Sequence, residues 1–237
     1  MAPEFLQRVF EDPAALAAGA ADLIAETLVG AITARGAASL VLAGGTTPVA
    51  SYRALATARV DWARVAFFWG DERCVPPDDS ASNYRMAREA LLDPADVPLS
   101  SVHRIAGERP AADAAAGYER TLRQRFADTL PRFDLVLLGV GEDGHVASLF
   151  PGRPVPPEGR WVLAVEPPTE GPDRVSLSPA ALAAARCICL LVSGAHKAAI
   201  VRRVLSGAAG ELPAAAVAGR AERVIWMLDR SAAGQLV

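Results

Sequence analysis

The chain has 237 residues, enough for one sizeable α/β domain or two small ones with a large core. Hydrophobic residues make up 51% of the chain and aromatic residues only 6%, so the core is expected to consist mainly of Ala, Val and Leu. The 24 basic and 27 acidic residues give a net charge of -3, which argues against nucleic acid and anionic membrane surfaces as partners.

Strand-like apolar runs alternate with helical patterns along the chain. The first helix is predicted from Pro13 to about Ala34, because Asp12 can cap it and proline suits the first helical position. The expected strands cover residues 39–42, 65–69, 135–138, 161–165, 174–177, 187–192 and 224–228. Further helices are expected near residues 84–92, 111–127, 180–185 and 196–205. This alternation predicts an α/β fold with a doubly wound, largely parallel sheet and helices on both faces. We expect residues 1–237 to form a single domain, in which the proline-rich stretch 151–172 is a loop around a short strand.

The N-terminal segment and the cysteines indicate the compartment. Residues 1–13 include acids where a signal peptide needs an apolar core, and no stretch approaches the roughly 18 uninterrupted apolar residues of a membrane span. Cys74, Cys187 and Cys189 are odd in number and have neither disulfide nor zinc spacing. Cys187 and Cys189 are expected to lie on one face of a strand as buried thiols. Together these features predict a cytoplasmic protein.

The first of four loops that follow predicted strands is AGGTTP, residues 43–48. Gly44 and Gly45 permit close approach of the backbone, and Thr46 or Thr47 can cap the helix that follows. Free N–H groups and hydroxyls at a helix start form an anion site. The segment is neither a Walker loop nor a G-x-G-x-x-G fingerprint, so ATP and dinucleotides are not indicated. Taken alone, it also fits a tight turn without a ligand.

The second loop, WGDERCVP at residues 69–76, places three charged residues directly beyond a buried strand. Asp71 can hydrogen-bond substrate hydroxyls, and Arg73 can bind a carboxylate or phosphate through two parallel hydrogen bonds. A surface salt bridge is the alternative. Ser80 or Ser82 is expected to cap the next helix.

The third loop, GVGEDGHVASLFPG at residues 139–152, follows a continuous apolar strand and contains His145 two positions after Asp143. Ligands in open α/β sheets bind just beyond the carboxyl ends of such strands. Gly144 and its neighbouring glycines leave room for a ligand near the imidazole. His145 can act as a general base at neutral pH, with Asp143 fixing its tautomer, although an isolated histidine is more often structural. No serine stands in a G-x-S-x-G elbow, and Ser148 is expected to cap a helix.

The fourth loop, SGAHK at residues 193–197, opens a predicted helix. Lys197 in the first turn works against the helix dipole, and this cost is understandable if an anion binds beside it. A solvated lysine is the alternative, and His196 is expected to pack or to face solvent.

Taken together, these four loops resemble those of bacterial 6-phosphogluconolactonases, in the glucosamine-6-phosphate isomerase/6-phosphogluconolactonase family. The resemblance extends over nearly the whole chain and includes SNY at residues 82–84 and RVSLS at residues 174–178, whose Arg174 faces the site in the family. The chain departs from the family at Ala43, where serine is frequent, and in the LPAAA segment at residues 212–216, where alanine replaces the polar residue that often follows Leu-Pro-Ala. Deaminases of the same fold share the G-x-G-x-D-G-H core but continue with Asn-Glu-Pro, whereas this chain continues ASLFPG at residues 147–152.

The resemblance implies a fold shared with glucosamine-6-phosphate deaminases, ribose-5-phosphate isomerases and CoA transferases. It implies hydrolysis of 6-phospho-D-glucono-1,5-lactone in the pentose phosphate pathway, with His145 activating water and Asp143 orienting the imidazole. Expected oxyanion donors are the backbone N–H groups of Gly44, Gly45 and Gly144. Expected phosphate ligands are Arg73, Arg174 and Lys197. No metal or other cofactor is expected, the only expected partner is a sugar-phosphate substrate, and the chain is expected to be a monomer or a small homo-oligomer. A sugar-phosphate isomerase-deaminase and a non-catalytic sugar-phosphate sensor are the alternative functions.

Overall fold

A six-stranded parallel sheet forms the centre of the computed structural model, which describes residues 4–153, 158–207 and 210–234. The strand order is β1-β9-β8-β5-β2-β3, and every pair in it is parallel. The strands are β1 (Glu4–Phe10), β2 (Ala38–Leu42), β3 (Val65–Trp69), β5 (Leu135–Leu138), β8 (Ile188–Val192) and β9 (Arg223–Asp229). The predicted parallel sheet is therefore confirmed.

A second, antiparallel sheet has the order β4-β7-β6. Its strands are β4 (Asp71–Arg73), β7 (Arg174–Leu177) and β6 (Val162–Val165). Gly70 connects the two sheets, because its N–H donates to the carbonyl of Leu42 and its own carbonyl accepts from the N–H of Leu177. Two strands expected in the parallel sheet thus belong to a small separate sheet, which lies directly beyond β3.

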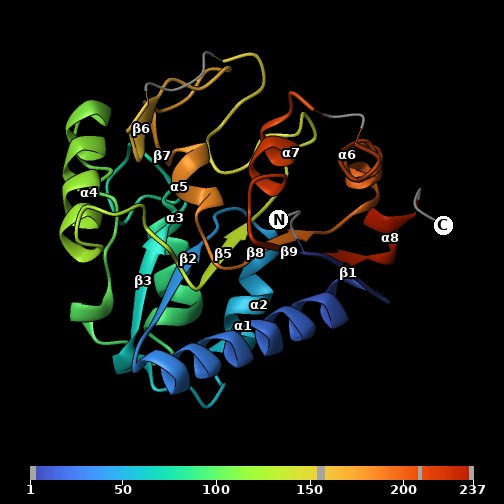
Figure 1. The fold of residues 1–237 in the computed structure, drawn as a ribbon, viewed down its shortest axis with the longest axis horizontal. Coiled ribbons are helices and arrows are strands. Elements are labelled where there is room, and N and C mark those ends of the chain that lie inside the picture. Colours follow the sequence, from blue (N-terminus) through green and yellow to red (C-terminus); the bar gives the residue numbers. More distant parts are fainter. Residues whose placement is uncertain (1–3, 154–157, 208–209, 235–237) are drawn as a thin grey trace.

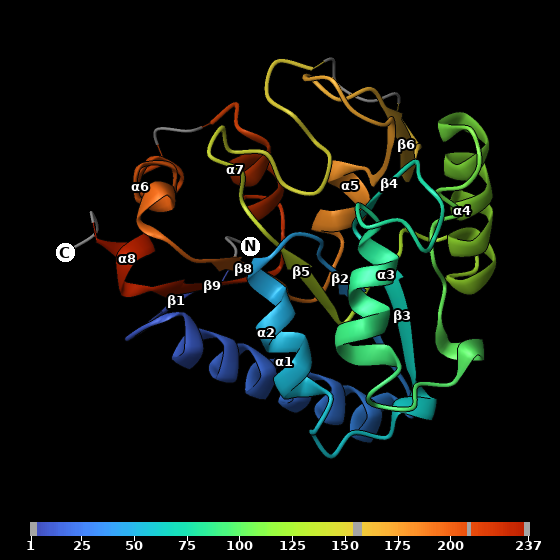
Figure 2. The ribbon, with the colours of Figure 1, turned by 180° about the vertical axis from the view of Figure 1, so that it is seen from behind.

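Helices cover the large sheet on both faces. The helices of the described residues are α1 (Pro13–Arg35), α2 (Thr47–Leu55), α3 (Asn83–Ala87) with a π-helical turn (Arg88–Leu92), α4 (Ala111–Arg125), α5 (Pro179–Ala183), α6 (Ala198–Leu205), α7 (Pro213–Ala218) and α8 (Arg230–Ala233). Among them, α4 packs against β6 and β7 of the small sheet. In Figure 1, α1 runs below the sheet while α5, α6 and α7 lie above it. The view from behind in Figure 2 has α2 and α3 side by side.

Helix α1 begins and ends where the sequence predicts. Asp12 accepts a hydrogen bond from the N–H of Ala15 at 2.8 Å, and Gly36 ends the helix with a φ of 80°. By length and composition the helix could cross a membrane. However, Leu16, Ile24 and Leu28 on this helix are buried in the core, each contributing roughly 2 kcal/mol to folding. We therefore interpret α1 as a core helix.

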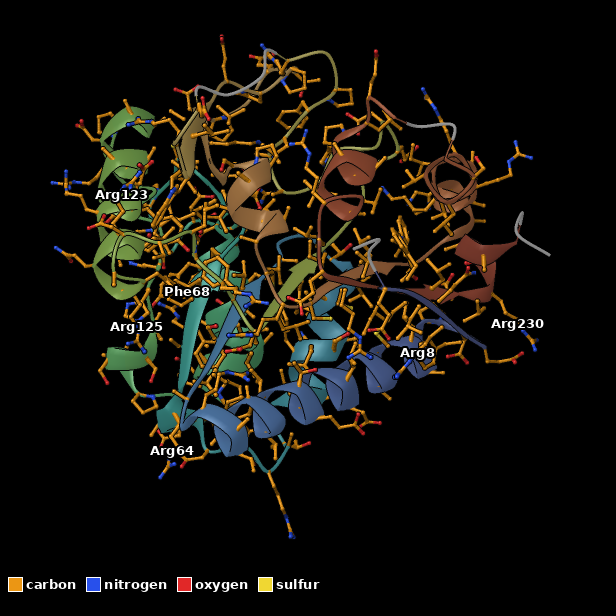
Figure 3. The ribbon with its side chains drawn as sticks, viewed as in Figure 1. Arg8, Arg64, Phe68, Arg123, Arg125 and Arg230 are labelled. Atoms are coloured by element: carbon orange, nitrogen blue, oxygen red, sulfur yellow. The ribbon has the colours of Figure 1, made fainter. Side chains whose placement is uncertain are left out.

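Buried side chains of both sheets form one continuous core. Phe68 lies inside it, with its ring centroid 5.2 Å from that of Phe133 (Figure 3). By contrast, Arg64 and Arg230 lie at the periphery in the same figure. Arg64 pairs with Asp61, and Arg230 pairs with Glu11. Charged groups in the interior are therefore exceptions that need a specific explanation.

Candidate active site

A cavity of about 630 Å³ opens at the carboxyl ends of β2, β5 and β8. All four loops expected to carry function contribute to its wall. The predicted site residues that line it are Gly44, Gly45, Thr46, Thr47, Asp71, Arg73, His145, Arg174 and Lys197. Most of these residues follow parallel strands, whose carboxyl ends meet at one edge of the sheet, whereas Arg174 comes from β7 of the antiparallel sheet.

The first loop presents unpaired donors to the cavity. The hydroxyl of Tyr52 in α2 donates to the carbonyl of Ala43 and accepts from its N–H, both at 2.9 Å, which fixes the start of the loop. Burial raises the pKa of Tyr52, so this hydroxyl stays neutral. Among the described residues, the N–H groups of residues 44–47 meet no acceptor, and the Thr46 side chain does not cap the helix. These donors at a helix start can bind an anion.

Gly44 lies directly against Asn83, the first residue of α3. A Cβ added at Gly44 would lie 2.5 Å from Nδ2 of Asn83 and closer still to its Oδ1. Asn83 is 2% exposed, lines the cavity and donates from Nδ2 to the carbonyl of Asp71 at 2.9 Å. Asn83 is not among the predicted site residues, because its segment is typical of a loop and helix start, with no distinct signal for ligand binding.

Glu72 has a structural role between two site residues. It is 3% exposed and accepts from the N–H groups of Arg73, Asn83 and Tyr84, each at 2.8 Å, and from the hydroxyl of Ser82 at 3.0 Å. Burial raises the pKa of Glu72, although these hydrogen bonds act in the opposite direction. Glu72 thus anchors α3 to β4. Ser82 caps α3 as predicted, by accepting from the N–H of Arg85.

Asp71 lines the cavity, and its carboxylate accepts hydrogen bonds from two side chains. It is 6% exposed and accepts a 2.6 Å hydrogen bond from the hydroxyl of Ser148, which is fully buried. A second, longer hydrogen bond of 3.3 Å comes from Nδ2 of Asn83. The expectation that Ser148 caps a helix is therefore wrong. Instead, Ser148 connects the third loop to β4 and holds Asp71 in place.

Arg73 and Arg174 lie opposite each other in the β4–β7 pair and both reach the cavity. Arg73 donates to the carbonyl of Ala81 at 2.6 Å, and the guanidinium of Arg174 lies 5.7 Å from the ring centroid of Phe150. Within the described part of the chain, the buried Nε atom of each arginine has no hydrogen-bond partner. Burial lowers the pKa of Arg174, the charge of Arg73 lowers it further, and Asp71 opposes both effects. Two adjacent guanidinium groups with free donors make a site for an anion.

His145 and Asp143 form a hydrogen-bonded pair in the third loop. Nδ1 of His145 lies 2.7 Å from Oδ1 of Asp143, and the N–H of His145 donates to the same oxygen at 3.1 Å. Burial alone would raise the pKa of Asp143, but these contacts with His145 lower it overall. An ionised Asp143 favours the tautomer with the proton on Nδ1, which leaves Nε2 unprotonated. The imidazole is 34% exposed and packs against Phe150 at a centroid distance of 5.0 Å.

Two glycines in this loop have different roles. A Cβ added at Gly141 would collide with both members of the His145–Asp143 pair, so this position must lack a side chain. Gly144 has a φ of 87°, where glycine is favoured, but it faces Leu212 and does not line the cavity. Its N–H already donates to the carbonyl of Gly141 at 3.0 Å. The prediction that Gly144 supplies an oxyanion donor is therefore wrong.

Lys197 ends a single 3-10 turn (Ala195–Lys197) between β8 and α6 and lines the cavity. His196, which is expected to pack or to face solvent, is exposed and also lines the cavity. Ser193 and Gly194, which precede the turn, line it as well and are not among the predicted site residues. Among the described residues, no three His, Cys, Asp or Glu side chains are grouped so that they could hold a metal ion.

Comparisons with known proteins agree with this geometry. The family described as glucosamine-6-phosphate isomerases/6-phosphogluconolactonase matches residues 11–226. The 6-phosphogluconolactonase of Mycobacterium tuberculosis is 40% identical over 96% of this chain and 97% of the relative. That of Rattus norvegicus is 38% identical over 95% and 91%, respectively. The structure of 6-phosphogluconolactonase from Trypanosoma brucei superposes with a TM-score of 0.84 at 31% identity and covers 99% of both chains. A monomeric glucosamine-6-phosphate deaminase has a TM-score of 0.79 at 23% identity and therefore shares the fold.

Proposed function

Because the chain belongs to the glucosamine-6-phosphate isomerase/6-phosphogluconolactonase family, we propose that it hydrolyses 6-phospho-D-glucono-1,5-lactone to 6-phosphogluconate in the pentose phosphate pathway. The observation that carries the proposal is the 2.7 Å hydrogen bond between Asp143 and His145, of which His145 lines a cavity that also contains three cationic side chains. A general base and an anion site are the two elements that this reaction needs. The substrate is an ester that also carries a phosphate.

His145 acts as the general base. With its Nδ1 proton held by Asp143, Nε2 accepts a proton from a water molecule as the water oxygen attacks the lactone carbonyl. The tetrahedral intermediate then collapses with cleavage of the bond between the carbonyl carbon and the ring oxygen. The imidazolium returns its proton to that leaving oxygen, so His145 ends the cycle neutral. General base catalysis of this kind contributes about 10²–10⁴-fold to the rate.

The developing oxyanion is stabilised by backbone donors of the first loop. The N–H groups of Gly44 and Gly45 have no acceptor among the described residues. Because they are held by the Ala43–Tyr52 hydrogen bonds, they need little reorganisation during the reaction. Asp71 accepts hydrogen bonds from sugar hydroxyls with the lone pairs that its contact with Ser148 leaves free.

The phosphate is bound by cations from two sides of the cavity. Arg73 and Arg174 supply planar guanidinium groups with free donors, and Lys197 supplies a compact charge. Thr46 and Thr47 also line the cavity and can donate from their hydroxyls. We assign these side chains mainly to substrate binding, so their loss should raise KM more than it lowers kcat.

The proposed steps need neither a metal nor another cofactor, because the lactone is already reactive and His145 supplies the base. We also propose that the protein works in the cytoplasm. The direct test is to generate the lactone in situ and compare its hydrolysis with the spontaneous background. Acceleration supports the proposal. Release of ammonia from glucosamine 6-phosphate without lactone hydrolysis would instead assign the chain to the deaminase branch. Binding of sugar phosphates without turnover of either would assign it as a sensor.

A further inference from the structure

A buried carboxylate lies behind the loop that carries Lys197. Asp229 is the last residue of β9 and is 1% exposed. It does not line the cavity. Its Oδ1 accepts hydrogen bonds from the N–H of Ala232 and the hydroxyl of Ser231, both at 2.7 Å, and thereby caps α8. Figure 1 shows α8 at the end of β9 and beside α6, the helix that follows the Lys197 loop.

The same carboxylate also holds the loop itself. Its Oδ2 accepts from the hydroxyl of Ser193 and, at 3.1 Å, from the N–H of Gly194. Gly194 has a φ of 100°, a conformation that other residues rarely adopt. The N–H of Lys197 then donates to the carbonyl of Gly194 at 3.0 Å, which closes the 3-10 turn. A short chain of hydrogen bonds therefore connects Asp229 to the backbone of Lys197.

The charge of Asp229 is stabilised by uncharged donors. Two hydroxyls and two backbone N–H groups surround it. Burial alone would raise the pKa of Asp229, but hydrogen bonds from Ser193, Ala232, Ser231 and Gly194 lower it overall. A buried anion close to a phosphate site repels the ligand. Its presence there therefore has to be explained by what it holds in place.

We infer that Asp229 is a positioning residue for substrate binding, which fixes the Ser193–Gly194 backbone so that Lys197 points into the cavity. The inference rests on the proposed function, because it uses Lys197 as a phosphate ligand. A carboxylate is required because both of its oxygens face donors. In an asparagine one oxygen is replaced by an NH2 group, which only donates. This group would face either the N–H of Gly194 or the N–H of Ala232, so one hydrogen bond would be lost.

The test is the kinetics of Asp229→Asn on the lactone, with Lys197→Ala as the reference. We expect KM to rise about tenfold, equivalent to about 1.4 kcal/mol, with kcat within about twofold of the original protein. The double variant should have nearly the KM of Lys197→Ala alone, because residues that act as a unit are not additive. The inhibition constant of inorganic phosphate as a competitive inhibitor should rise in Asp229→Asn together with KM. This constant reports binding without chemistry.

Asp134→Asn is a control for the loss of a buried carboxylate away from the cavity, although Asp134 also pairs with Arg35. Asp134 is also a buried carboxylate, and it accepts hydrogen bonds from the hydroxyl and the backbone N–H of Ser39. It precedes β5, however, and so lies at the amino ends of the parallel strands, away from the cavity. This variant should change the melting temperature without changing KM. The inference is overturned if Asp229→Asn leaves KM unchanged, or if its effect is equally large in the Lys197→Ala background.

A failure of the proposed function has a different signature. If the original protein does not hydrolyse the lactone, the inference can still be tested from the stabilisation of the protein by inorganic phosphate in a thermal melt. Loss of that stabilisation in Asp229→Asn but not in Asp134→Asn supports the positioning role. Equal stabilisation in all three proteins overturns it.

Discussion

Gly141→Ala should inactivate the enzyme without unfolding it. Gly141 has no positive φ, so its backbone conformation tolerates alanine. The added Cβ, however, would lie 2.5 Å from Oδ1 of Asp143 and closer still to Nδ1 of His145, the two atoms that make the 2.7 Å hydrogen bond. The perturbation therefore acts on the proposed catalytic pair rather than on the core.

The size of the effect follows from the overlap. Non-bonded carbon atoms stay about 3.5–4.0 Å apart, so the imidazole and the carboxylate must each move by about 1 Å or more. A displacement of 1 Å can cost about 10²-fold in rate, and complete loss of the general base about 10²–10⁴-fold. We therefore expect kcat to fall by about 10²–10⁴-fold, which corresponds to about 2.7–5.5 kcal/mol in the activation free energy.

The assay is lactone hydrolysis corrected for the spontaneous rate, with the melting temperature measured in parallel. Gly30→Ala is the matched control, because Gly30 is exposed in α1 and a Cβ there meets nothing within 4 Å. That variant should keep its kinetics and gain about 0.5–1 kcal/mol of stability. Asp143→Ala removes the acceptor without a clash and should also lower kcat. A kcat for Gly141→Ala within about threefold of the original protein would refute the reasoning.

Three further predictions test other parts of the site. Arg174→Ala should raise KM for the lactone about tenfold and weaken inhibition by inorganic phosphate in steady-state assays, because one of two adjacent guanidinium groups is lost; an unchanged inhibition constant would exclude Arg174 from phosphate binding. Gly44→Ala should lower the free energy of unfolding by about 2 kcal/mol in urea titrations, since the new Cβ displaces Asn83 from its hydrogen bonds to Asp71; an unchanged midpoint would contradict this packing. The lowered pKa of Asp229 means that its stabilising contribution is present above the ordinary pKa of about 4 and is lost as pH falls through the folded-state value. The difference in unfolding free energy between the original protein and Asp229→Asn should therefore be largest near neutral pH and shrink below about pH 4 in pH-dependent denaturation; a constant difference would contradict it.

The sequence predicts the large sheet well because its strands are continuous apolar runs. Both β3 and β5 match their expected bounds. β1 is missed because it is an edge strand whose residues are mostly exposed, so it lacks a clear apolar pattern. β4 is missed because it consists of three charged residues, two of which are buried by contacts that only the folded chain brings together. Helices α7 and α8 are also missed, since each has only one or two turns.

The location of the site is predictable from the sequence, but its internal contacts are not. Loops that follow parallel strands must meet at one edge of the sheet, and nine of the eleven predicted site residues line one cavity there. The hydrogen bond from Ser148 to Asp71, 77 positions apart in the chain, has no local signature in the sequence. The same holds for Asp229 and the loop that it supports. The role of Gly144 as an oxyanion donor is predicted wrongly, because its N–H donates to the carbonyl of Gly141. That hydrogen bond depends on the detailed path of the loop.

We propose that His145 is the general base of a lactone hydrolase. The most direct measurement is kcat of His145→Ala for the lactone, relative to the original protein and above the spontaneous background. We expect kcat to fall by about 10²–10⁴-fold, with KM changed by less than about threefold. An unaltered kcat in the variant, beside clear acceleration by the original protein, would contradict the role assigned to His145.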